Sequence, residues 1–213
     1  MPSANALPVV VTIPWQVDQA LREIGLTRDI VNAVAVAAAG ARADALAVDP
    51  NGAPGTLSYI HGVRSTRLQL LPLGWEMSKA GNVESTVNHS LGIQLIFQNV
   101  HRACGANDPE AISGKGPASR NLVKCGQMSL FTSPEDMKVR PIGESPTVWM
   151  ICVSADDASF RAEVSCPEIF EGDQFDGFVR RLFVVDESFD PKPTPRRDSD
   201  DDDGLLDVAV TKK

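Results

Sequence analysis

The sequence lacks the short motifs that identify the common catalytic and cofactor sites. It has no Gly-x-Ser-x-Gly nucleophile turn, no His-Glu-x-x-His zinc helix, no Gly-x-Gly-x-x-Gly turn and no Walker loop. Its three histidines are isolated from one another along the chain. No local pattern therefore indicates a serine hydrolase, a zinc protease or a dinucleotide-binding protein, and no motif points to a protein family.

Cysteine is scarce, and its spacing does not favour a metal site. The chain has four cysteines, and no two of them form a Cys-x-x-Cys pair. Only His101 and Cys104 lie close together, which is too few ligands for a finger-like zinc cluster. We expect reduced cysteines that act as small apolar residues, and neither a metal nor a cofactor. A zinc site assembled from distant cysteines and a histidine or two is the alternative.

No stretch of the chain is apolar enough for a membrane span. The longest uncharged run, Ile30–Ala41, is shorter than the roughly 20 residues that a spanning helix needs. The first six residues carry no Lys or Arg, and the apolar run after them is interrupted by Pro14, unlike a secretory signal. We therefore expect a soluble protein of the cytoplasm that does not bind membranes.

Basic residues are outnumbered, and the imbalance is concentrated at the C-terminus. The formal net charge is −8, and about half of it lies in residues 186–213, which hold nine acids and five bases. The run Asp198–Asp203 follows a proline-rich segment and has too little apolar surface to offset the entropy of ordering. The composition predicts one globular domain over residues 1–185 and a disordered acidic tail over residues 186–213.

Helical patterns occupy the first half of the chain, and strand patterns occupy most of the second half. Apolar spacing and capping residues predict helices at 14–24, 28–46 and 56–71, with a short one at 118–124. Runs of β-branched and apolar residues predict strands at 9–13, 75–77, 92–100, 147–154, 160–166 and 178–185. The fold class that follows is α+β, with N-terminal helices packed on a mostly antiparallel sheet.

A glycine-rich loop before the short helix is a candidate phosphate site. Backbone N–H groups at a helix start, with cations nearby, bind anions. The candidates for phosphate or nucleic-acid binding are Arg102, Lys115, Arg120 and Lys124. A solvated loop that caps the helix explains the same pattern. Few aromatic residues accompany these bases, so stacking on single strands has little support.

Polar residues are dense between Trp75 and Asn88, beside the strand predicted at 92–100. Such residues line a pocket or satisfy their own backbone in turns. The candidate pocket residues are Glu76, Asn82, Glu84, His89 and His101. The acids between Asp156 and Asp176 are expected instead on a solvated edge, where charge protects a sheet from pairing.

The tail ends in an apolar string that follows the acidic run. Its candidate docking residues are Leu205, Leu206, Val208 and Val210. Acids followed by apolar residues allow a disordered segment to dock into a basic-rimmed groove on a partner. Alternatively, the tail folds back over the basic loop of its own chain and competes there for phosphate, and a tail that only improves solubility explains the pattern equally well.

The function we expect is that of a non-catalytic binding or adaptor protein in a larger assembly. It would dock a protein partner through the tail, and its loop bases permit association with nucleic acid. The alternative is an enzyme that acts on a nucleotide or nucleic acid. In that case the fold would bring together Glu76, Glu84, His89, His101 and Lys115 in one pocket.

Overall fold

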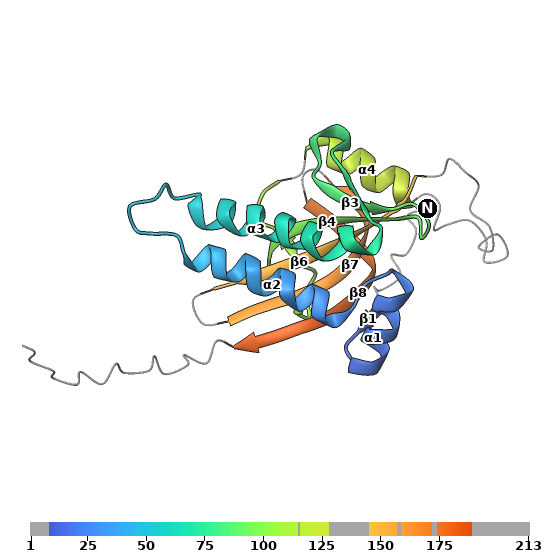
Figure 1. Cartoon of the computed structure of the whole chain (residues 1–213), viewed down its shortest axis with the longest axis horizontal. Helices are drawn as coiled ribbons and strands as arrows, with labels where there is room; N and C mark the ends of the chain where they lie inside the picture. The colour runs from blue at the N-terminus through green and yellow to red at the C-terminus, as the bar shows by residue number, and fades with distance from the viewer. Residues whose placement is uncertain (1–8, 115, 128–144, 157–158, 172–173, 189–213) are drawn as a thin grey trace, which may run out of the picture.

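A computed structural model describes residues 9–114, 116–127, 145–156, 159–171 and 174–188. These residues form an eight-stranded mixed sheet with helices on both faces (Figure 1). The predicted α+β class, with helices on a mostly antiparallel sheet, is confirmed. Residues after 188, which include most of the predicted tail, lie outside the described residues.

The sheet is built around a long C-terminal hairpin. Its strand order is β1 (Val9–Val11), β8 (Gln174–Ser188), β7 (Ser159–Glu171), β6 (Thr147–Ala155), β4 (Ile93–His101), β3 (Ser85–Asn88) and β2 (Glu76–Ser78). The β1–β8 and β4–β6 pairs are parallel, and the others are antiparallel. The short strand β5 (Glu110–Ala111) pairs with the far end of β4.

Three helices cover one face of the sheet, and one covers the other. Helices α2 (Arg28–Ala43) and α3 (Ala53–Leu70) lie side by side over the sheet, and α1 (Pro14–Glu23) lies near β8 (Figure 1). Helix α4 (Pro117–Gln127) packs on β6 and β7 from the opposite face. Single-turn 3₁₀ helices occupy Leu71–Leu73 and Ala80–Asn82.

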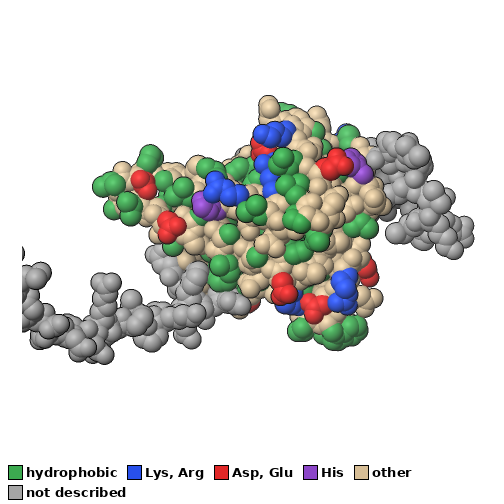
Figure 2. All heavy atoms as spheres, in the orientation of Figure 1, with side chains coloured by type: hydrophobic (Ala, Val, Ile, Leu, Met, Phe, Trp, Pro, Cys, Tyr) green, Lys and Arg blue, Asp and Glu red, His purple; other side chains and the backbone are tan. Residues whose placement is uncertain are grey.

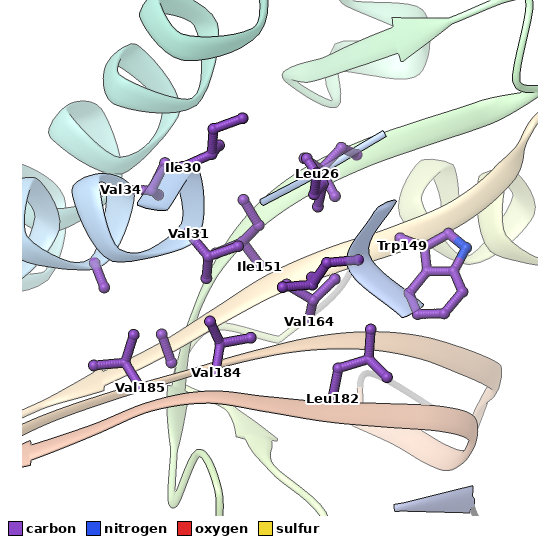
Figure 3. Packing of buried hydrophobic residues seen from close by; sticks show 14 of the residues in the cluster. Leu26, Ile30, Val31, Val34, Trp149, Ile151, Val164, Leu182, Val184 and Val185 are labelled. Atoms are coloured by element: carbon purple, nitrogen blue, oxygen red, sulfur yellow. The ribbon is translucent and has the colours of Figure 1, made fainter. Parts of the chain in front are cut away.

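Strand periodicity divides the core into two layers. In β6, Trp149, Ile151 and Val153 face α1 and α2, whereas the intervening residues face α4. Figure 3 shows residues of α2 and of β6–β8 packed together in the larger layer. The many alanines of α2 allow this close contact. The side chain of Thr27 caps α2 by accepting a hydrogen bond from the Ile30 N–H at 3.3 Å.

No single helix in the described ranges has the length and hydropathy required to cross a membrane. Helices α1 and α2 meet these criteria only when taken together, and they are bent by 93° at the break between them.

Two segments predicted as loops contain strands. Residues 78–89, expected to be a polar loop, include β3, where Ser85, Thr86 and Val87 are buried. The polar residues fit because the buried Gln94 Nε2 donates to Ser85 Oγ at 2.8 Å. Residues 167–171 and 174–177, also expected to be part of a loop, extend the β7–β8 hairpin at both of its strands. The segment at 9–13, predicted as a short buried strand or an extended entry segment, forms β1, in which Val9 and Val10 are exposed because this strand lies at the edge of the sheet.

Candidate functional site

The candidate site lies where strand β4 loses its partner on one side. On that edge β3 pairs with residues 93–95 and β5 with residues 100–101. No strand in the described part of the chain pairs with the segment between them. Helix α3 packs across β4 here, and three hollows converge on Tyr59, the single tyrosine of the chain.

The largest hollow, which we call the Tyr59 cleft, has a volume of about 600 Å³. Its wall combines the end of α2, the first turns of α3, the end of β4 and the residues after β5. Its polar side chains include those of Arg42, Thr56, Tyr59, Asn99, His101 and Ser113. None of the described residues that line it is acidic. The cleft is therefore suited to a ligand with negative charge.

Asn99 joins the walls of the Tyr59 cleft. Its Nδ2 donates to the Gly55 carbonyl at 3.0 Å, and its Oδ1 accepts from Ser58 Oγ at 2.8 Å. Its own backbone carbonyl accepts from the Ile112 N–H at 3.2 Å. One side chain thus ties the start of α3 to β4, while the backbone ties β4 to the segment after β5. These bonds form the cleft without a ligand.

Helix α3 approaches the sheet closely through small residues. Its buried positions include Ser58, Gly62 and Thr66, spaced four residues apart on one side. A Cβ built on Gly62 would lie only 2.3 Å from the Phe97 ring, so only glycine fits there. The Tyr59 ring lies 6.3 Å from the Phe97 ring between centroids and is 38% exposed. Burial of its hydroxyl raises the pKa of Tyr59, so the phenol stays a neutral donor.

The outward side of α3 carries exposed apolar residues, whereas Leu70 at the end of the helix is fully buried. Ile60, Val63, Arg64 and Leu68, here called the α3 face, line a second hollow of about 380 Å³. At its rim Arg67 Nη2 donates to Glu84, and Lys79 Nζ lies 3.5 Å from the same carboxylate. The hydrogen bond from Arg67 is the main cause that lowers the pKa of Glu84.

The five predicted pocket residues do not come together in one hollow. Glu76 and His89 face each other across the β2–β3 edge at 3.7 Å, and both are about 70% exposed. Glu84 pairs with Arg67, Asn82 lines the third hollow, and His101 lines the Tyr59 cleft. The enzyme alternative required these groups to converge, so it loses that support. Lys115, the fifth residue that the enzyme alternative requires, lies outside the described residues.

The predicted phosphate residues are also dispersed. Arg102 forms an ion pair with Glu110 at the β4–β5 pairing. Arg120 and Lys124 lie one turn apart on α4, on the sheet face opposite α3. Binding of phosphate or nucleic acid by these residues stays a prediction. Leu205, Leu206, Val208 and Val210 of the tail lie outside the described residues, so docking through them stays a prediction too.

A buried ion pair connects β7 and β8, and the sequence analysis missed it. Glu163 was expected on a solvated edge, but its exposed fraction is 0% and that of Arg181 is 1%. Arg181 donates from Nε and Nη2 to the two carboxylate oxygens at 2.9 and 2.8 Å. Ala162 and Val164 flank Glu163 and point to the opposite face of the strand. Such an alternation of apolar and charged residues is typical of a strand with one solvated face, so nothing in the local sequence signals that Glu163 is buried.

This ion pair holds the loop between β4 and β5 against the sheet. Arg181 also donates to the Gly105 and Asn107 carbonyls, both at 3.2 Å. Glu163 accepts from the Cys104 N–H at 2.6 Å, although Cys104 has a left-handed φ of 57°. The side-chain amide of Gln174 in β8 accepts a hydrogen bond from the Ala111 N–H at 3.1 Å and donates one to the Ala111 carbonyl at 3.3 Å. The wall of the Tyr59 cleft that follows β5 therefore depends on β8.

Cys104 is expected to resist alkylation in the folded protein. Burial, and then the charge of Glu163, raise the pKa of its thiol to about 12, so the reactive thiolate is absent at pH 8. Its Sγ donates to two carbonyls at 3.3 and 3.4 Å. Iodoacetamide at pH 8, followed by peptide mass spectrometry, should modify the exposed Cys125 quickly and Cys104 only after unfolding in guanidinium. Equal rates at both cysteines in the folded protein would contradict this expectation.

Among the described residues, no group of three or more His, Cys, Asp or Glu side chains is arranged to hold a metal ion. No protein-family model matches the chain, and comparisons with curated proteins and with solved structures find no match either.

Proposed function

We propose that this protein is a non-catalytic adaptor in a larger assembly, with the α3 face as its docking surface and the acidic tail as the segment that docks there. The observation that carries the proposal is the orientation of α3. This helix buries Leu70 at its end, but at its other three buried positions it turns the small residues Ser58, Gly62 and Thr66 inward. It leaves Ile60 and Leu68 43% and 66% exposed. A surface helix of a monomer usually buries its large apolar residues.

The apolar residues of the α3 face continue beyond the helix. Leu71 and Leu73 follow in the 3₁₀ turn and are 38% and 58% exposed. In Figure 2 hydrophobic side chains are spread over the side of the molecule on which α3 lies, with Lys and Arg among them. Several exposed apolar residues on one side of a molecule are a feature of sites that bind other proteins.

The charge around the α3 face defines the chemistry of its occupant. The hollow at this face is lined by two arginines and one acid, and the acid, Glu84, pairs with Arg67. Arg64 forms no salt bridge with a described residue and supplies the remaining positive charge. An occupant with carboxylates and apolar side chains would therefore complement it. The tail has this composition, since Asp198–Asp203 precede Leu205, Leu206, Val208 and Val210.

The tail is long enough to reach the face. Residues 189–204 separate β8 from the apolar string, and an extended segment of that length spans roughly 50 Å at about 3.3 Å per residue. A folded domain of this size is roughly 40 Å across, from a radius of gyration near 16 Å. Docking within one chain and docking between neighbouring copies are therefore both within reach.

A peptide titration tests this function. The receptor is the full-length chain with Leu205, Leu206, Val208 and Val210 replaced by serine, and the probe is a fluorescent peptide of residues 198–210. We expect saturable binding that weakens with salt, and a loss of at least tenfold in affinity with Leu68→Asp or Arg64→Glu. The matched controls are Val48→Asp, at a position that is 89% exposed, and Arg22→Glu on α1.

Binding that is unchanged by Leu68→Asp and Arg64→Glu would place the docking surface elsewhere and refute this assignment. The native chain should bind the same peptide more weakly than the serine variant does, because its own tail competes. The concentration dependence of its mass in analytical ultracentrifugation separates docking between copies from docking within one chain.

A further inference from the structure

The Tyr59 cleft has a chemistry that the docking function does not use. We propose that it binds a small phosphorylated molecule with a planar aromatic group, the class to which nucleotides belong. This proposal does not depend on the adaptor function: Tyr59 lines both hollows, but Arg42, His101 and Ser113 line the cleft and not the hollow of the α3 face. It rests on the charge, the hydrogen-bond donors and the aromatic surface of the cleft.

Arg42 supplies the positive charge of the cleft. Its side chain is partly buried at the end of α2 and lines the cleft, and it forms no salt bridge with any described residue. Asp156 lines an adjoining hollow together with Arg42, but its carboxylate accepts from the Ser159 N–H at 2.8 Å and from the Ser159 hydroxyl at 3.2 Å. The guanidinium therefore remains available for an anion, and a phosphate group matches its paired donors.

Hydrogen-bond donors surround the same space. Helix α3 begins in the wall of the cleft without a side-chain cap. In its first turn the Ala53 N–H donates to the Pro50 carbonyl at 2.8 Å, and Pro54 has no N–H. The N–H of Gly55 is therefore the backbone donor of this turn that can bind a ligand. The hydroxyls of Thr56 and Ser113 and the ring of His101 also line the cleft. A helix start, a cation and hydroxyl donors in one cavity are the groups that hold a phosphate.

Tyr59 supplies the surface for a planar group. The Tyr59 ring packs at a tilt of 55° against the buried Phe97 ring, so the partly exposed tyrosine is held against the core. Stacking on such a ring is favourable for any base, because every base has a π-face. The cleft volume of about 600 Å³ lies within the range of small-molecule sites.

Calorimetric titration of the full-length protein tests the ligand class. The probes are the four nucleoside 5′-monophosphates, the matching nucleosides and inorganic phosphate. We expect at least one nucleotide to bind at least tenfold more tightly than its nucleoside or phosphate alone. Arg42→Gln should weaken the nucleotide at least tenfold and leave the nucleoside unchanged, whereas Tyr59→Leu should weaken both. Arg22→Gln, at an exposed arginine of α1, is the matched control and should have no effect.

A second variant separates occupancy of the cleft from damage to the fold. A Cβ on Gly55 meets no atom within 4 Å, so Gly55→Leu should fill the cleft without a clash and abolish nucleotide binding. Gly40→Leu adds the same side chain at another open helical position and should bind like the native protein. No binding of any nucleotide at millimolar concentration, or full binding by Gly55→Leu, would overturn the proposal. Loss of peptide docking at the α3 face leaves this test unaffected.

Discussion

Replacing Arg181 with methionine is expected to lower the free energy of unfolding by about 3–5 kcal/mol, the range for breaking a buried ion pair by removing one partner. The substitution leaves the Glu163 carboxylate buried without its bidentate partner, and desolvation of an unpaired charge is strongly unfavourable. Ser165 Oγ and the Cys104 N–H still donate to Glu163, but neither supplies a compensating charge. The same substitution frees the loop carbonyls of Gly105 and Asn107.

Urea denaturation monitored by circular dichroism measures this loss. The matched control is Arg180→Met at the adjacent position, where a surface ion pair with Glu23 at 3.3 Å contributes at most about 1 kcal/mol. Adding Glu163→Leu to Arg181→Met should recover part of the stability, because it removes the unpaired carboxylate. A cost for Arg181→Met no larger than that of Arg180→Met would show that the pair is not a determinant of stability.

Gly62→Ala is expected to destabilise the protein by about 1–3 kcal/mol, the usual cost of overpacking. Alanine has the higher helix propensity and should stabilise an open helical position by up to about 1 kcal/mol. At Gly62 the added methyl group would lie 2.3–2.5 Å from three atoms of the Phe97 ring, so α3 or the ring must move. Because Phe97 supports Tyr59, the same shift should also distort the Tyr59 cleft.

Gly40→Ala on α2 is the matched control, since a Cβ there meets no atom within 4 Å. Thermal unfolding should show opposite signs for the two substitutions, with Gly40→Ala neutral or stabilising. In a double-mutant cycle with Phe97→Leu, the cost of Gly62→Ala should shrink, because the smaller side chain makes room. Stabilisation by Gly62→Ala would contradict the close contact between α3 and the sheet.

Local patterns predicted much of the fold. The helix at 28–46 is α2, although it ends at Ala43, and the strands predicted at 147–154 and 160–166 are parts of β6 and β7, which pair antiparallel. The strand at 92–100 is β4. These elements were predictable because helical and strand periods, caps and turn residues are properties of neighbouring residues.

The candidate site was much less predictable. His101 is the one predicted pocket residue that lines the Tyr59 cleft, while Arg42 and Tyr59 were not singled out at all. The three come from the end of α2, from α3 and from the end of β4. Nothing in their local sequence marks them, since their shared cavity exists only because β4 lacks a partner between β3 and β5.

The α+β class, most of the helices and the long C-terminal strands follow from the local sequence, because period and turn chemistry are encoded over short windows. The side of each element that is covered depends instead on how the elements pack together. The pattern of α3 is apolar on several sides, and the fit of Gly62 against Phe97 selects the side that faces the sheet. Glu163 lies in the interior for a related reason: its partner Arg181 is 18 residues away in the chain and adjacent only across the β7–β8 ladder. Pairing across such separations depends on packing and burial, which local sequence does not specify.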